Sequence, residues 1–206
     1  MPSLFPMFVK LEGRPVLVVG AGKVGEQKIA GLLDTGARVR VVSLRATDQV
    51  RAWANEGMIH LEQRAYESTD LDATFLAIVA TSIRTLNEQV YREAQARGIL
   101  CNVVDVPDQC DFYYPSVVKR GDLQIAISTS GQSPSLAQRI RQQLEKQFGP
   151  SYADWVAELG DVRRQVLRSD LNPERKRDLL QSLASRTAFE AEVARQESHE
   201  PTGGAA

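Results

Sequence analysis

Cysteine and histidine are scarce in this sequence, which has two residues of each among its 206. Two cysteines, Cys101 and Cys110, are too few for a disulfide scaffold, so we expect a protein of the reducing cytoplasm. The same scarcity leaves no cluster of residues with the spacing of a metal site. The sequence therefore argues against a disulfide-stapled secreted domain and against a resident metal centre.

Long apolar runs and an excess of charge are also missing. No run approaches the roughly 18 residues that would span a bilayer, and the first residues lack the pattern of a signal peptide. The 25 basic and 26 acidic residues give a net charge of −1, so no overall field attracts nucleic acid or anionic lipid. We expect a globular chain of one large or two small domains, with neither nucleic acid nor membrane as a partner.

What the sequence does contain is a glycine motif between a strand pattern and a helix pattern. The apolar run 16–19 leads into G-A-G-K-V-G, residues 20–25, and a helical pattern follows. Gly20 permits a tight turn, Gly22 lets a pyrophosphate approach the backbone, and Gly25 lets the helix pack closely on the strand. The helix N-terminus then offers free N–H groups to phosphates. The motif predicts a dinucleotide site; the alternative is a glycine-rich turn that binds no phosphate.

Strand and helix patterns alternate through the first half of the chain. This alternation predicts an α/β fold with a Rossmann-like parallel sheet. Thr47 is positioned to cap the second helix. The expected strands are 15–20, 38–42, 58–61, 75–80 and 99–104, and the expected helices are 23–34, 47–55 and 85–96.

The second half has a different character. Strand patterns at 112–118 and 123–128 lack a helix between them, which indicates a separate small β unit. Helices are expected from Ser133, as N-cap, to 148, then over 152–168 and 173–195, with Asp170 capping the last. The corresponding domains are 1–112, 113–148 and 149–195, followed by a mobile tail at 196–206.

Asp105 ends the fifth predicted strand, at the edge where open α/β sheets bind ligands. A carboxylate there lies near the expected position of a nicotinamide ring and could take a proton while hydride leaves to the cofactor. The alternative is a turn residue that accepts hydrogen bonds from nearby backbone N–H groups.

A hydroxyl-rich loop precedes the helix predicted from Ser133. Ser128, Thr129, Ser130, Gly131 and Ser133 combine hydroxyls with free backbone N–H groups, a combination that suits a carboxylate or phosphate. The alternative is plain capping of the helix by Ser133, with the other hydroxyls in solvent.

The end of the second strand lacks the acidic residue that often binds the adenosine ribose. Ser43, Leu44 and Arg45 occupy this place, and Arg45 could face a 2′-phosphate. The sequence therefore does not decide between NAD and NADP.

Two further motifs carry a family resemblance. They are C-N-V-V-D-V-P at 101–107 and Y-P-S-V-V-K-R-G-D-L-Q-I-A-I-S-T-S-G-Q-S-P at 114–134. With the glycine loop, they make residues 3–195 resemble the precorrin-2 dehydrogenases, which occur alone or as the N-terminal part of siroheme synthase. The resemblance implies a Rossmann domain, a dimerisation unit at 113–148, a C-terminal helical domain and a homodimer. It also implies oxidation of precorrin-2 to sirohydrochlorin with NAD and, in some members, insertion of ferrous iron to give siroheme.

The resemblance assigns roles to single residues. Asp105 is the implied catalytic residue. The resemblance implies cofactor contacts at Lys23, Val24, Leu44 and Arg45, with Ala80 and Thr81 as further contacts. The glycine motif itself and the end of the second strand add Gly20, Gly22, Gly25 and Ser43 to the predicted cofactor site. The loop 128–133 could bind some of the eight carboxylates of the tetrapyrrole. Two other hypotheses remain open: an NAD-binding sensor without catalysis, and an NAD(P) oxidoreductase for a smaller substrate.

Overall fold

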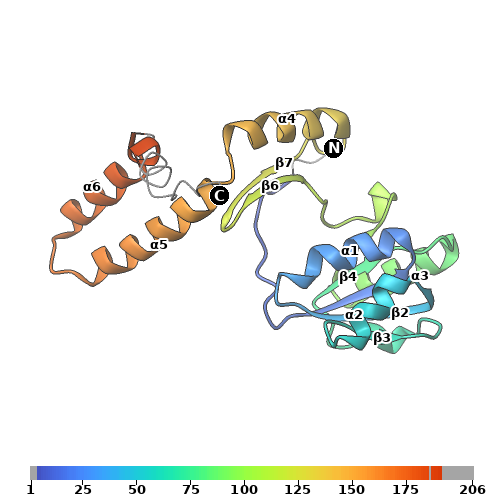
Figure 1. Ribbon diagram of the computed structural model, residues 1–206. Helices are drawn as coiled ribbons and strands as arrows, with labels where there is room; N and C mark the ends of the chain where they lie inside the picture. The colour runs from blue at the N-terminus through green and yellow to red at the C-terminus, as the bar shows by residue number, and fades with distance from the viewer. Residues whose placement is uncertain (1–3, 186, 192–206) are drawn as a thin grey trace, which may run out of the picture. The chain divides into compact units, whose positions relative to one another are not determined.

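The computed structural model describes residues 4–185 and 187–191 (Figure 1). The chain forms two compact units, divided between Tyr114 and Pro115. None of the helices within the described ranges is long and apolar enough to cross a membrane. The second unit contains both the β hairpin and the C-terminal helices, so the expected division after 148 stays a prediction. The expected division after 112 also stays a prediction.

The first unit is a five-stranded parallel sheet with the strand order β3-β2-β1-β4-β5. This order confirms the Rossmann-like α/β class predicted from the alternating patterns. The strands are β1 (Pro15–Ala21), β2 (Arg38–Ala46), β3 (His60–Glu62), β4 (Leu76–Val79) and β5 (Leu100–Val103). The helices are α1 (Lys23–Leu33), α2 (Asp48–Asn55) and α3 (Arg84–Ala96), with 3₁₀ turns at Ser68–Leu71 and Pro107–Gln109.

The side chains of β1 alternate between two buried clusters. Val16 and Val18 pack with Ile29 of α1, whereas Leu17 packs with Val90 of α3. Successive residues of a strand point to opposite faces, so this division places α1 and α3 on opposite faces of the sheet. Burial on both faces explains why β1 and β4 read as continuous apolar runs rather than alternating ones.

Strand β2 is longer than the predicted strand 38–42 and runs to Ala46. Ser43, Leu44 and Arg45 therefore lie within the strand and not after it. The register between β1 and β2 shifts between Val19 and Ala21, where Ala21 pairs with Ala46. The Ser43 hydroxyl stabilises the backbone at this register shift, because it accepts a hydrogen bond from the Ala21 amide at 3.2 Å and donates one to the Arg45 carbonyl at 2.7 Å.

A buried carboxylate, Asp70, anchors the 3₁₀ turn to the edge of the sheet. Its side chain is 1% exposed and accepts from Arg40 Nη1 at 2.9 Å and from Arg64 Nη2 at 2.6 Å. The Glu67 amide donates to its other oxygen at 2.9 Å. Glu62 of β3 pairs with the same two arginines, so four charged side chains tie β2, β3 and the turn together.

Asp70→Ala is expected to lower the free energy of unfolding by about 2–4 kcal/mol, because it leaves the two arginines and the Glu67 amide without their buried acceptor. Burial alone would raise the pKa of Asp70, but the bonds from Arg64 and Glu67 outweigh it and lower that pKa. A lowered pKa means that the stabilisation is present above the unfolded-state value near 3.8 and is lost as the pH falls through the folded-state value. Urea titrations from pH 7 to pH 3 measure both effects. Equal stability of variant and parent at pH 7 would contradict this role.

The second unit begins with an antiparallel hairpin, β6 (Ser116–Arg120) and β7 (Leu123–Ile127). Helices α4 (Pro134–Gln147), α5 (Tyr152–Arg168) and α6 (Pro173–Leu183) follow. Ser133 caps α4 as predicted, accepting from the Leu136 amide at 3.3 Å. The Arg120 guanidinium donates to the Phe148 carbonyl at 2.9 Å and joins the hairpin to the end of α4.

Three expected boundaries in this region were wrong. The strand predicted at 112–118 begins only at Ser116, because residues 112–114 remain with the first unit, where the Asn102 amide donates to the Phe112 carbonyl at 2.7 Å. Asn172, not Asp170, caps α6, because Pro173 occupies the first helical position. Helix α6 ends at Leu183, and the helical residues 187–191 start anew from Ser185, whose hydroxyl accepts from the Ala188 amide at 3.2 Å. The tail expected at 196–206 lies outside the described residues.

Candidate active site

The glycine turn after β1 is fixed by two close approaches of backbone to backbone. Gly20 has a φ of +102°, and a Cβ atom on it would lie 2.4 Å from the Ala80 carbonyl oxygen. A Cβ atom on Gly25 would lie 2.1 Å from the Gly20 carbonyl oxygen. No side chain fits at either distance, so these two glycines are required for β1, α1 and the end of β4 to pack together.

Gly22 differs from its neighbours because a Cβ atom there would meet nothing within 4 Å. It is the N-cap of α1, with an ordinary φ of −76° and no side chain bonding to the first turn. The exposed residues Lys23 and Val24 follow it, so the first N–H groups of the helix face open space. An uncapped helix N-terminus beside a bare backbone fits the pyrophosphate of a dinucleotide.

The other predicted cofactor contacts lie along the same carboxyl edge of the sheet. Ala80 and Thr81 directly follow β4 and touch the turn at Gly20. Asn87, which is buried, holds Thr81 in place by donating to its carbonyl oxygen at 3.1 Å. On the β2 side, Leu44 is 66% exposed and Arg45 is also exposed, whereas the Ser43 hydroxyl is engaged within the fold.

Asp105 follows β5 at this edge and has a strained backbone. Its φ is +64°, a left-handed conformation that asparagine and aspartate tolerate better than other side chains. Its side chain is exposed, and within the described part of the chain its carboxylate accepts no hydrogen bond. The alternative that Asp105 serves only to bond nearby backbone N–H groups therefore lacks support. A strained residue that presents an unengaged carboxylate beside a cofactor site suits proton transfer.

The surroundings of Asp105 include residues outside the predicted set of site residues. Lys28 of α1 lies over the ring of Tyr114, with Nζ 3.8 Å from the ring centroid. Burial lowers the pKa of Lys28, and the charges of Asp105 and Cys110 oppose that shift. The Cys110 thiol contacts the carbonyl oxygens of Val103 and Val106. These contacts join residues up to 86 positions apart (28 to 114), which no local sequence pattern reveals.

The hydroxyl loop lies in the second unit, and its own backbone uses several of its hydroxyls. Ser128 Oγ accepts from the Ser130 amide at 3.1 Å, and Thr129 Oγ1 accepts from the Ser133 amide at 3.0 Å. Ser130 has a φ of +52°. With Ser133 capping α4, the helix has fewer free N–H groups than α1. Each accepting hydroxyl still has its own O–H to donate to an anion.

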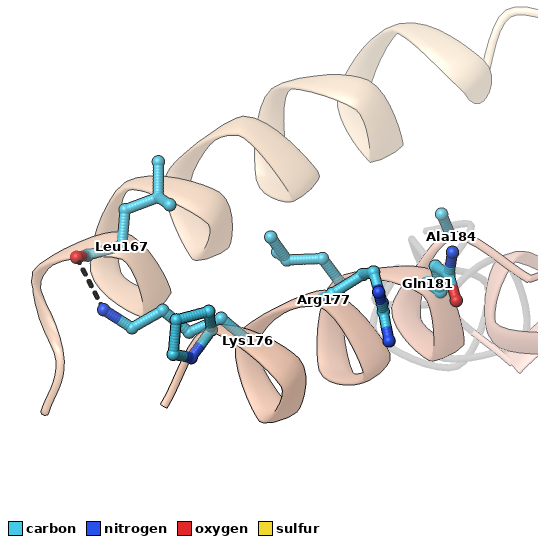
Figure 2. A pocket seen from close by; sticks show the side chains of 7 residues that line it. Leu167, Lys176, Arg177, Gln181 and Ala184 are labelled. Carbon is cyan, nitrogen blue, oxygen red and sulfur yellow. Dashed lines mark hydrogen bonds between the residues drawn. The ribbon is translucent and has the colours of Figure 1, made fainter. Parts of the chain in front are cut away.

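A groove of about 520 Å³ runs between α5 and α6 (Figure 2). Leu167, Arg177, Gln181 and Ala184 are among the residues that line it, and the Lys176 ammonium donates to the Leu167 carbonyl at 3.1 Å. None of these residues is a predicted site residue. Among residues 4–185 and 187–191, no group of three or more His, Cys, Asp and Glu side chains is arranged to hold a metal ion.

Comparisons with known proteins agree with this geometry. Residues 7–116 match a family described as "Putative NAD(P)-binding", and residues 120–147 match one described as "Sirohaem biosynthesis protein central". The siroheme synthase of Citrobacter koseri is 42% identical over 162 residues, which are 78% of this chain and 35% of that protein. The siroheme synthase of Nitrosococcus oceani is 40% identical over 147 residues, which are 71% of this chain and 31% of that protein. This chain thus spans about a third of the length of these relatives.

Among solved structures, "SirC, precorrin-2 dehydrogenase" superposes with a TM-score of 0.80 at 28% sequence identity. The match covers 94% of this chain and 96% of SirC. The first unit is therefore an NAD(P)-binding domain, and the order of sheet, hairpin and helices is that of a solved dehydrogenase.

Proposed function

We propose that this chain, which belongs to the family described as "Putative NAD(P)-binding", oxidises precorrin-2 to sirohydrochlorin in siroheme biosynthesis, because siroheme synthases and the precorrin-2 dehydrogenase SirC are similar to it. The oxidation removes a hydride and a proton from the substrate, and NAD⁺, when bound, accepts the hydride. The observation that carries the proposal is the unengaged carboxylate of Asp105 at the same sheet edge as the uncapped glycine turn.

In this proposal the first unit's residues have separate tasks. The N–H groups at the start of α1, at Lys23 and Val24, bind the pyrophosphate next to Gly22. Leu44 and Arg45 lie beside the adenosine half, and Ala80 and Thr81 border the turn at the next strand. A carboxylate oxygen of Asp105 takes the proton that leaves the substrate as the hydride departs.

Other parts of the proposal rest on the family resemblance. NAD rather than NADP is proposed as the cofactor, although Arg45 is exposed beside the expected ribose position. The hydroxyl loop 128–133 is proposed to bind substrate carboxylates through its remaining O–H groups. A homodimer formed through 113–148 and a place in the cytoplasm are also proposed. Free thiols at both Cys101 and Cys110 support a reducing compartment.

An anaerobic assay tests the function. Enzymatically made precorrin-2 is incubated with the protein and NAD⁺, and sirohydrochlorin and NADH are followed by absorbance. Stoichiometric formation of both products, dependent on NAD⁺, is expected. Failure of folded, NAD-binding protein to convert precorrin-2 would instead favour a sensor or a dehydrogenase for a smaller substrate.

A second arm of the assay adds ferrous iron as a substrate. Siroheme formation above the spontaneous rate would add chelatase activity to the function. A rate equal to the protein-free rate would limit the protein to the oxidation.

A further inference from the structure

The Lys28 ammonium is a half-buried cation. It lies 3.8 Å from the centroid of the Tyr114 ring, within the range of a cation–π contact. Among the described residues, Lys28 forms no salt bridge with a carboxylate. The titratable groups that act on it are Asp105 and the Cys110 thiol, which come from the segment after β5.

A half-buried ammonium without a direct anionic partner loses hydration that the fold does not fully replace. Desolvation outweighs the attraction of Asp105, and the pKa of Lys28 is lowered accordingly. An anionic group of a ligand would restore the missing interaction. The ligand would at the same time lie next to Asp105, the proposed proton acceptor.

Two ligands of the proposed reaction carry anionic groups: the dinucleotide with its pyrophosphate and the tetrapyrrole with its carboxylates. The pyrophosphate is expected at the start of α1, whereas Lys28 lies five residues beyond Lys23, a rise of about 7.5 Å along the helix. Lys28 is turned instead to Tyr114 and to the segment that contains Asp105. The tetrapyrrole is thus the better match.

We propose that Lys28, supported by the face of Tyr114, binds a carboxylate of the tetrapyrrole and so positions the ring at Asp105. This inference rests on the proposed function and extends it by a residue that determines substrate specificity. The contact selects for polycarboxylated rings, since a ring without a carboxylate at that place leaves the lysine unpaired.

The test compares Lys28→Gln with Lys28→Arg and with Lys10→Gln. Lys10→Gln is the matched control, since it makes the same change at an exposed position of the first unit. A stable porphyrin with eight carboxylates and NAD⁺ are titrated separately, and precorrin-2 oxidation is measured under anaerobic conditions.

Lys28→Gln is expected to weaken porphyrin binding about tenfold or more and to raise the KM for precorrin-2 more than it lowers kcat. The affinity of Lys28→Gln for NAD⁺ should stay within twofold of that of the parent protein. Lys28→Arg should keep most of the parent protein's affinity for the porphyrin.

Each other outcome has a definite meaning. Unchanged porphyrin binding by Lys28→Gln overturns the inference and leaves the proposed function intact. Weaker NAD⁺ binding assigns Lys28 to the nucleotide phosphates and also overturns it. Tyr114→Leu, which keeps the lysine and removes the ring face, is expected to weaken porphyrin binding several-fold. If the parent protein neither binds the porphyrin nor oxidises precorrin-2, the proposed function itself fails.

Discussion

Replacing Asp105 by asparagine is expected to slow precorrin-2 oxidation by about 10²–10⁴-fold, the usual contribution of a positioned acid or base. An amide has nearly the shape of a carboxylate but cannot take the proton that leaves with the hydride. The dissociation constant for NAD⁺ should change less than twofold, because the proposed pyrophosphate site lies at the start of α1 and not at the end of β5. Single-turnover rates and NAD⁺ titrations measure the two quantities separately.

Asparagine is the appropriate substitution because Asp105 has a φ of +64°. Asparagine adopts this left-handed conformation readily, whereas alanine would add backbone strain of about 1 kcal/mol and confuse a chemical loss with a structural one. Thermal unfolding of Asp105→Asn should match that of the parent protein. Normal turnover by this folded variant would remove Asp105 from the proposed chemistry.

Gly22→Ala is expected to weaken NAD⁺ binding by about tenfold or more without destabilising the protein. The added methyl group meets nothing within 4 Å and suits a φ of −76°, so the fold accepts it. The methyl group would occupy the space through which a phosphate reaches the N–H groups of α1. Loss of one hydrogen bond to a charged phosphate costs about 1.5–3 kcal/mol, which corresponds to the expected loss of affinity.

Substitutions at two other glycines of α1 serve as controls for this experiment. Gly31→Ala makes the same change further along α1, again with nothing within 4 Å, and should leave NAD⁺ affinity unchanged. Gly25→Ala should unfold or strongly destabilise the first unit, because its Cβ would lie 2.1 Å from the Gly20 carbonyl oxygen. Calorimetric titration and thermal melts separate the three variants. Equal NAD⁺ affinity in Gly22→Ala and the parent protein would contradict a phosphate site at this turn.

The sequence predicted those features that depend on residues close together in the chain. The glycine turn follows from its two flanks, and Thr47 and Ser133 cap their helices through bonds that span three residues. The parallel sheet follows from repeated strand and helix patterns. Local patterns were sufficient in these cases because the stabilising contacts are themselves local.

Features that depend on distant pairs could not be predicted in the same way. The Ser43 hydroxyl extends β2 by bonding to Ala21, 22 residues away. Asp70 becomes a buried anchor only when β2 supplies Arg40, and Lys28 meets Tyr114 only after the sheet has formed. Such contacts arise from topology, and single residues of these types give no signal in a sequence window.

The space available for a Cβ atom differs among the three glycines of the motif, so we expect selection to act differently on substitutions at Gly20 and Gly25 than on substitutions at Gly22. Selection for cellular abundance alone would act against side chains at Gly20 and Gly25, because 2.4 Å and 2.1 Å clashes with backbone oxygens prevent folding. The same selection would tolerate alanine at Gly22, because a Cβ atom there meets nothing within 4 Å and the proposed constraint at this position is the bound cofactor. A library of variants sorted once for abundance and once for catalytic rescue should therefore separate these three positions. In a lineage that has lost the proposed activity but kept the fold, Gly22 should be the first of the three to drift.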